Sequence, residues 1–125
     1  MRSMFRAAGL LAAVLFTACG TPQAGDECDS SGFLCENRTS ALECRVGTWT
    51  SLPCRGPAGC ELEGDTVTCD MTLNREGDAC AASAEGKGLC TATGDGTLEC
   101  RQGKFVRTNN CASCSVVGEQ VVCQR

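Results

Sequence analysis

The chain has 125 residues, a formal net charge of −4 at pH 7, 13 cysteines and no histidine. An acidic chain of this kind is a poor nucleic-acid binder, because phosphate contacts need clustered lysine and arginine. Histidine is the usual base in nucleophilic catalysis and a common ligand of zinc, so we expect no enzyme activity, no metal site and no cofactor.

The first residues predict an export signal. Arg2 and Arg6 precede a run of ten apolar or small residues over 7–16. Such a run is too short to span a bilayer, which needs about 20 residues. A basic start followed by a short apolar run is typical of a secretory signal peptide, which is removed from the mature protein.

The signal ends in Phe16-Thr17-Ala18-Cys19-Gly20, which resembles the lipobox of bacterial lipoproteins. In that family the cysteine is acylated and becomes the first residue of the mature chain; Phe16 stands where leucine is usual. The resemblance implies a lipoprotein signal peptide over residues 1–18 and a palmitate-type lipid anchor on Cys19. Gly20, where aspartate signals inner-membrane retention in enteric bacteria, implies the outer membrane rather than the inner one.

The cysteine count is consistent with a lipid on Cys19. Thirteen is an odd number, which is awkward in an oxidising compartment. Without Cys19, twelve cysteines remain, six in each half of the chain. They are Cys28, Cys35, Cys44, Cys54, Cys60 and Cys69, then Cys80, Cys90, Cys100, Cys111, Cys114 and Cys123.

The mature chain divides into four parts. A lipidated tether over residues 19–24 leads to the first module (25–71), a joint (72–76) and the second module (77–125). Residues 25–76 carry ten acidic and four basic side chains, whereas residues 77–125 carry five of each. Any face that attracts cations is therefore expected in the first module, although simple solvation also explains the surplus of acid.

One stretch occurs twice and predicts an internal repeat. Leu42-Glu43-Cys44-Arg45-Val46-Gly47-Thr48-Trp49 and Leu98-Glu99-Cys100-Arg101-Gln102-Gly103-Lys104-Phe105 carry leucine, glutamate, cysteine, arginine, glycine and an aromatic residue at the same offsets. Each stretch predicts a β-hairpin. We expect a type I turn with Gly47 in a left-handed bulge, because a type I′ turn would place the β-branched Val46 at positive φ.

Trp49 and Phe105 fall on the returning strands of these hairpins. We expect each ring to cover the disulfides of its module. The alternative is an exposed platform on which a sugar ring stacks, because an aromatic face offers a flat apolar surface.

The fold expected from this pattern is small, disulfide-rich and mainly β: two six-cysteine modules of short hairpins and loops. Each module has little apolar surface to bury, and three disulfides of about 2–4 kcal/mol each can supply the missing stability. A hairpin turn at Gly64-Asp65, or at Gly118-Glu119, pairs the flanking cysteines across two strands. We therefore predict the disulfides Cys60–Cys69 and Cys114–Cys123. The other four cysteines of each module allow three pairings, which stay open.

The two modules behind a lipobox resemble the small cysteine-rich lipoproteins that are numerous in myxobacteria. A weaker likeness, over Cys44-x-x-Gly47 to Cys54 and Cys69-Asp70, is to peritrophin-type chitin-binding modules, whose cysteine spacing differs. Gly47-Thr48-Trp49 through Pro53-Cys54 is also similar to the end of a sushi domain, which has four cysteines rather than six. All three resemblances imply binding or scaffolding.

We therefore expect a non-enzymatic, membrane-anchored lipoprotein of the cell envelope. Its expected partners are membrane lipid, through Cys19, and an envelope or surface protein. The alternative is a carbohydrate-binding module for chitin or peptidoglycan, with Trp49 and Phe105 as its binding residues.

Overall fold

The computed structural model describes residues 21–29 and 31–125, so the predicted signal peptide and Cys19 lie outside the described residues. The fold is small, mainly β and disulfide-rich, which confirms the predicted class. The first module holds β1 (Phe33–Asn37), β2 (Ser40–Arg45), β3 (Thr48–Pro53), β4 (Cys60–Glu63) and β5 (Thr66–Cys69). The second holds the single 3₁₀ turn η1 (Ala82–Ala84) and then β6 (Gly88–Cys90), β7 (Gly96–Arg101), β8 (Lys104–Asn110), β9 (Ser113–Val117) and β10 (Gln120–Gln124).

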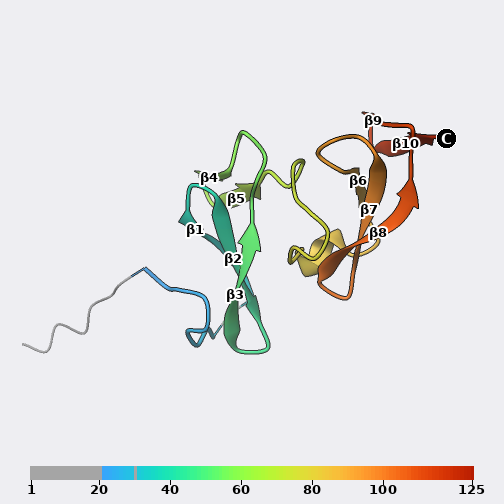
Figure 1. Cartoon of the computed structure of the whole chain (residues 1–125). Helices are drawn as coiled ribbons and strands as arrows, with labels where there is room; N and C mark the ends of the chain where they lie inside the picture. The colour runs from blue at the N-terminus through green and yellow to red at the C-terminus, as the bar shows by residue number, and fades with distance from the viewer. Residues whose placement is uncertain (1–20, 30) are drawn as a thin grey trace, which may run out of the picture.

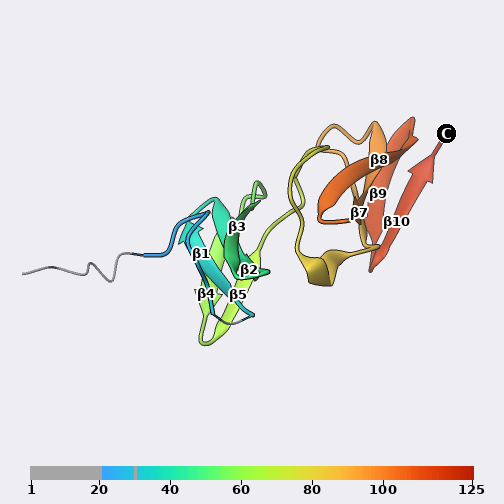
Figure 2. The same cartoon turned by 90° about the horizontal axis from the view of Figure 1, so that it is seen from below.

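The strands follow the same order in both modules. A three-stranded antiparallel sheet, β1-β2-β3 or β6-β7-β8, is followed by a two-stranded hairpin, β4-β5 or β9-β10. The two modules lie end to end (Figure 1), with the first described residues at one end of the molecule and the C-terminus at the other. The same arrangement is seen after a quarter turn (Figure 2).

The segment before the first cysteine adds a short edge to each sheet. In the first module, the Gly25 amide donates to the Trp49 carbonyl and the Trp49 amide donates to the Asp26 carbonyl, both at 2.9 Å. In the second module, Gly77, Phe105 and Asp78 make the same two bonds at 2.8 and 2.9 Å. The strand that carries the aromatic residue is therefore paired on both sides.

The turn between β2 and β3 differs from the predicted one. Arg45 pairs with Thr48, which leaves a two-residue loop with φ of 48° at Val46 and 77° at Gly47. Gln102 and Gly103 repeat this with 52° and 81°. The predicted type I turn is therefore wrong, and the loops have the positive φ values of a type I′ turn, whose twist matches that of the strands. Val46 is fully exposed, so its branched side chain adds no clash with neighbouring elements.

The disulfides have one order in both modules: first cysteine to third, second to fifth and fourth to sixth. The predicted bridges Cys60–Cys69 and Cys114–Cys123 are therefore wrong, although these cysteines are cross-strand neighbours as predicted. The pairs are Cys28–Cys44, Cys35–Cys60, Cys54–Cys69, Cys80–Cys100, Cys90–Cys114 and Cys111–Cys123.

Geometry explains the correction. Directly opposite residues at a non-hydrogen-bonded site have Cα atoms about 4.5 Å apart, at the short limit for a disulfide. The observed bridges from the β4-β5 hairpin reach outward instead. Cys60 bonds to Cys35 on β1 and Cys69 bonds to Cys54 after β3, with Cα separations of 5.7 and 5.2 Å. Each strand of the hairpin is thereby fastened to the three-stranded sheet.

Most of the buried apolar residues form one cluster that crosses from one module to the other. Ala41 and Leu52 of the first module belong to it, together with Ala81, Leu98 and Phe105 of the second. The six disulfides, by contrast, each stay within one module. The modules are thus separate in their covalent bonds and joined in their packing.

Replacement of Val46 by asparagine is expected to stabilise the protein by about 1 kcal/mol, because asparagine tolerates the left-handed region better than a β-branched residue does. The measurement is chemical unfolding with the disulfides intact. Gln102→Asn is the matched control and should gain less, since glutamine is not β-branched. An unchanged or lowered stability of Val46→Asn would contradict the strain at this turn.

Candidate contact surfaces

The two predicted aromatic platforms are not equivalent. Phe105 is only 2% exposed and belongs to the buried cluster, so its predicted role as a binding platform is wrong. Trp49 is half-buried and lies directly opposite Cys44, whose disulfide partner is Cys28. Directly opposite residues share one face of a sheet, which places the ring beside this bridge. At most one of the two predicted platforms is therefore available to a ligand.

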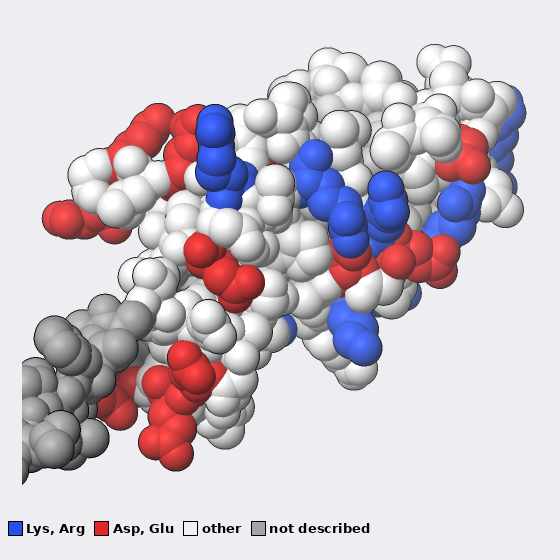
Figure 3. Space-filling view, turned by 60° about the vertical axis from the view of Figure 1, so that its left-hand side comes forward, with Lys and Arg blue, Asp and Glu red and all other residues white. Residues whose placement is uncertain are grey.

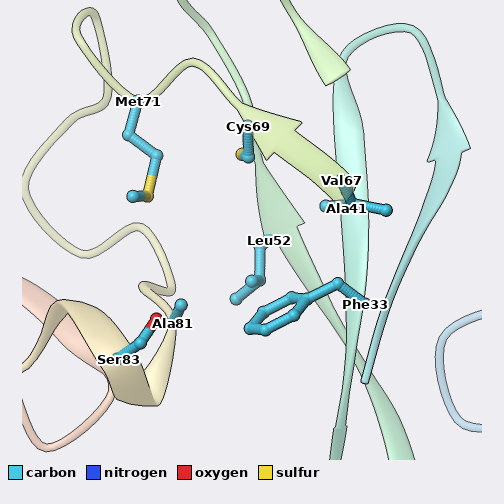
Figure 4. Close-up of a pocket in the computed structure, with 8 residues that line it drawn as sticks. All are labelled: Phe33, Ala41, Leu52, Val67, Cys69, Met71, Ala81 and Ser83. Atoms are coloured by element: carbon cyan, nitrogen blue, oxygen red, sulfur yellow. The ribbon is translucent and has the colours of Figure 1, made fainter. Parts of the chain in front are cut away.

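An apolar cleft lies where the modules meet (Figure 4). It has a volume of about 180 Å³ and is lined by side chains of the first module and the second module. Phe33, 40% exposed, extends beside Leu52 on one side, while Met71 points in from the end of the first module. Ser83 supplies the hydroxyl of the lining. Pockets for small ligands usually measure about 300–1,000 Å³. The cleft is therefore better described as part of the packing between modules than as a ligand site.

The apolar face behind this cleft is found in one module and not in the other. Phe33 pairs with Glu43, and the residue in the same register of the second module is Gly88, which pairs with Glu99. Sequence reasoning missed Phe33 as part of a contact surface. The sequence did contain a signal for this surface, because the position of an aromatic residue in one module corresponds to a glycine in the other.

The same contrast continues deeper in the sheet. Ala41 and Leu52, which the second module covers, correspond by offset to Thr97 and Thr108. These two hydroxyls lie 2.6 Å apart and bond to each other. The second module therefore presents polar groups where the first presents an apolar surface.

Polar contacts close the junction around the cleft. The Arg55 guanidinium donates two hydrogen bonds to the Asp78 carboxylate, at 2.7 and 3.0 Å. The fully buried side chain of Asn74 accepts from the Arg55 amide at 3.0 Å and donates to the Pro53 carbonyl at 2.8 Å. The side chain of Asn74 thus fixes the joint to the first module, although the joint itself carries no disulfide.

A second contact joins the modules on β2. The Glu43 carboxylate is buried and accepts a hydrogen bond from the Ala82 amide at 3.1 Å. Arg45 binds both Glu43 and the Cys80 carbonyl. In the first module, the charged pair Glu43 and Arg45 of the repeated stretch therefore binds the second module.

The junction also shifts two pKa values. Burial would raise the pKa of Asp78, but the hydrogen bonds from Arg55 and from the Arg75 amide outweigh it, and the pKa is lowered. The same hydrogen bond, with the attraction between the charges, raises the pKa of Arg55. Both shifts favour the ionised pair, which links the second module to the first.

Acidic side chains gather on the first module and mix with basic ones towards the second (Figure 3). Two of the acidic side chains accept hydrogen bonds within turns: the Thr72 hydroxyl lowers the pKa of Asp70, and the hydroxyls of Thr91 and Thr93 lower the pKa of Asp95 to about 2.

Over residues 21–29 and 31–125, no three His, Cys, Asp or Glu side chains are grouped as they would be to hold a metal ion. Within the same residues, no helix is long and apolar enough to cross a membrane.

The C-terminal hairpin, β9-β10, carries exposed valines that the sequence reasoning did not consider. Val116, Val117 and Val122 are 56%, 65% and 38% exposed. In the hairpin of the first module, β4-β5, exposed glutamates Glu61 and Glu63 flank the exposed Leu62. The uncharged run Ser113 to Val117 was the sequence signal for this surface.

No protein-family model, no curated protein and no solved structure matches this chain. The likenesses to myxobacterial lipoproteins, peritrophin-type modules and sushi domains therefore stay predictions. The candidate surfaces rest on the geometry of this chain alone.

Acid is expected to weaken the junction through Asp78. A carboxyl whose pKa is lowered by folding contributes stability above its unfolded pKa, about 3.9, and loses it as the pH falls through the folded value. Asp78→Asn should therefore have a lower free energy of unfolding than the native chain at neutral pH. Between about pH 4 and pH 2, its free energy of unfolding should fall less than that of the native chain. Urea unfolding across this range measures the difference. Asp65→Asn, in the exposed β4-β5 turn, is the control, and equal pH profiles for Asp78→Asn and the native chain would contradict the role of Asp78.

Proposed function

We propose that this chain is a membrane-anchored, non-enzymatic lipoprotein of the cell envelope, whose two modules make contact with other proteins. The observation that carries the proposal is the pairing of cysteines. All twelve cysteines after the lipobox form disulfides with one another, as exported proteins do in an oxidising compartment. Cys19 is the thirteenth, and acylation gives it a use that needs no partner.

The position of the modules supports an anchored role. Residues 20–24 span at most roughly 17 Å, so an anchor on Cys19 would hold the first module close to the membrane. The C-terminal hairpin lies at the opposite end of the molecule, where it would face outward (Figure 2). The lipobox residues favour the outer membrane over the inner one.

Two features favour contact over catalysis. The apolar cleft is too small for most ligands, and its walls belong to the packing between modules. The exposed apolar side chains lie on a hairpin, whose edge and face suit another polypeptide. A scaffold that presents such a hairpin needs a rigid fold, which six disulfides provide.

Cys19→Ala is expected to abolish labelling of the chain by a palmitate analogue in cells. The matched control is the double variant Cys28→Ala/Cys44→Ala, which removes two cysteines and should keep the label. In-gel fluorescence of the immunoprecipitated chain measures both. Label retained by Cys19→Ala would refute the anchor.

Carbohydrate binding at Trp49 is the second candidate, because this half-exposed ring is the single tryptophan of the chain. The burial of Phe105 leaves it without a second platform, and sugar sites usually surround such a ring with several polar groups. We expect no saturable shift of tryptophan emission with chito-oligosaccharide or muropeptide. A saturable shift, with retention on the insoluble polymer that is lost in Trp49→Ala but kept in Phe33→Ala, would favour the carbohydrate function instead.

A further inference from the structure

The C-terminal hairpin has an open edge on β10. Val117 and Gln120 close its two-residue turn, so hydrogen-bonded and non-hydrogen-bonded pairs alternate along the hairpin from this pair onward. The backbone groups of Val121 and Cys123 consequently point away from β9. Within residues 21–29 and 31–125, these groups have no backbone hydrogen-bond partner outside the hairpin. Unpaired backbone groups on an exposed strand are a template for pairing with another strand.

The other edge of the hairpin is less accessible. A Cβ atom added at Gly94 would lie 3.8 Å from the Cys114 carbonyl oxygen and 3.9 Å from its nitrogen, so the loop before β7 runs against β9. Figure 2 shows β10 as the outermost strand of the second module. On β10, a Cβ atom added at Gly88 would lie 3.6 Å from Val121 Cγ2, so β6 contacts that side chain, whereas the outward backbone groups of Val121 and Cys123 stay unpaired within the described residues.

The corresponding hairpin of the first module is protected by charge. Glu61 and Glu63 stand on β4, and acidic side chains at an edge oppose pairing with a like strand. On β9 the matching positions are Ser115 and Val117. β9 and β10 carry no charged residue, and Glu119 in the turn between them is the one charge of residues 113–124. The charge difference between the two hairpins therefore lies on β4 and β9, whereas β5, the strand that matches β10, carries no charge itself and is paired with an acidic strand.

We infer that a second copy of this chain pairs with β10 in antiparallel register about Val122. This register sets Val121 opposite Cys123 of the second copy, so that the outward backbone groups of both strands meet. Val122 then faces its own counterpart, and the exposed valine is covered. Just beyond each end of the paired strands, Glu119 in the turn of one copy comes near Arg125 of the other, whose guanidinium donates to Asn109 at 3.3 Å within its own chain.

Charge also explains why a second copy fits. Residues 77–125 carry five acidic and five basic side chains, so two second modules approach without net repulsion. Residues 25–76 carry ten acidic and four basic side chains, and these parts repel one another. Pairing through β10 brings the neutral modules together and keeps the acidic ones out of the interface. The inference rests on the proposed protein-contact role and names the partner.

The test uses the full chain in cells with a photoreactive amino acid at Gln120, which faces Gln124 of the second copy in this register. We expect a cross-linked species of twice the chain mass, with the link mapped to residues 121–125. The matched control places the same probe at Thr66, the corresponding position of the first hairpin, and should give no dimer. A probe that captures a different protein at Gln120, with no dimer, overturns the inference and leaves the protein-contact role intact.

Three variants test the register. Val122→Lys sets two ammonium groups against each other and should lower the cross-link yield at least about tenfold. Glu119→Arg should also lower it, and Glu119→Arg combined with Arg125→Glu should restore it. Unchanged migration without reducing agent shows that each variant keeps its disulfides. A cross-link yield that stays the same in all three variants overturns the proposed pairing, whether or not Cys19 carries lipid. So does a yield from the probe at Thr66 that equals the yield from Gln120.

Discussion

The structure depends on fastening each two-stranded hairpin to its three-stranded sheet by one disulfide per strand. An isolated hairpin is marginally stable in water, and a module of about 50 residues buries too little apolar surface to hold one in place. The bonds Cys35–Cys60 and Cys54–Cys69 close loops with sequence separations of 25 and 15 residues, which restrict the unfolded chain slightly more than a bridge within the hairpin, because closure entropy grows only with the logarithm of loop length. Because both strands are held, the hairpin keeps its position without a core of its own.

Covalent bonding and packing divide the molecule differently. Disulfides define two units, whereas the buried cluster runs through both, and Arg55, Asn74 and Asp78 join the first unit to the second with hydrogen bonds. A small domain gains buried area by packing against a neighbour, and here the neighbour is the next part of the same chain. The two modules consequently form one folded body.

Sequence reasoning predicted the features set by local pattern. Alternation of side chains and the Gly64-Asp65 turn predicted the register of β4 and β5, down to the pairing of Cys60 with Cys69 across the strands. Disulfide connectivity failed because it depends on how the hairpin packs on the sheet, which no local pattern specifies. The turn at Val46 failed for a related reason: strand twist outweighs the preference of one side chain. The burial of Phe105, directly opposite Cys100, fits the expectation that the ring lies over a disulfide of its own module. The cleft at Phe33 was beyond prediction, since it arises where one module covers the other.

The Thr97–Thr108 hydroxyl pair makes the second module chemically different from the first at the equivalent surface. In the first module the equivalent surface is alanine and leucine, and it seats the module that follows. Hydroxyls that satisfy each other at 2.6 Å offer no such apolar seat, so the packing that joins the first module to the second is not repeated on the equivalent surface of the second module.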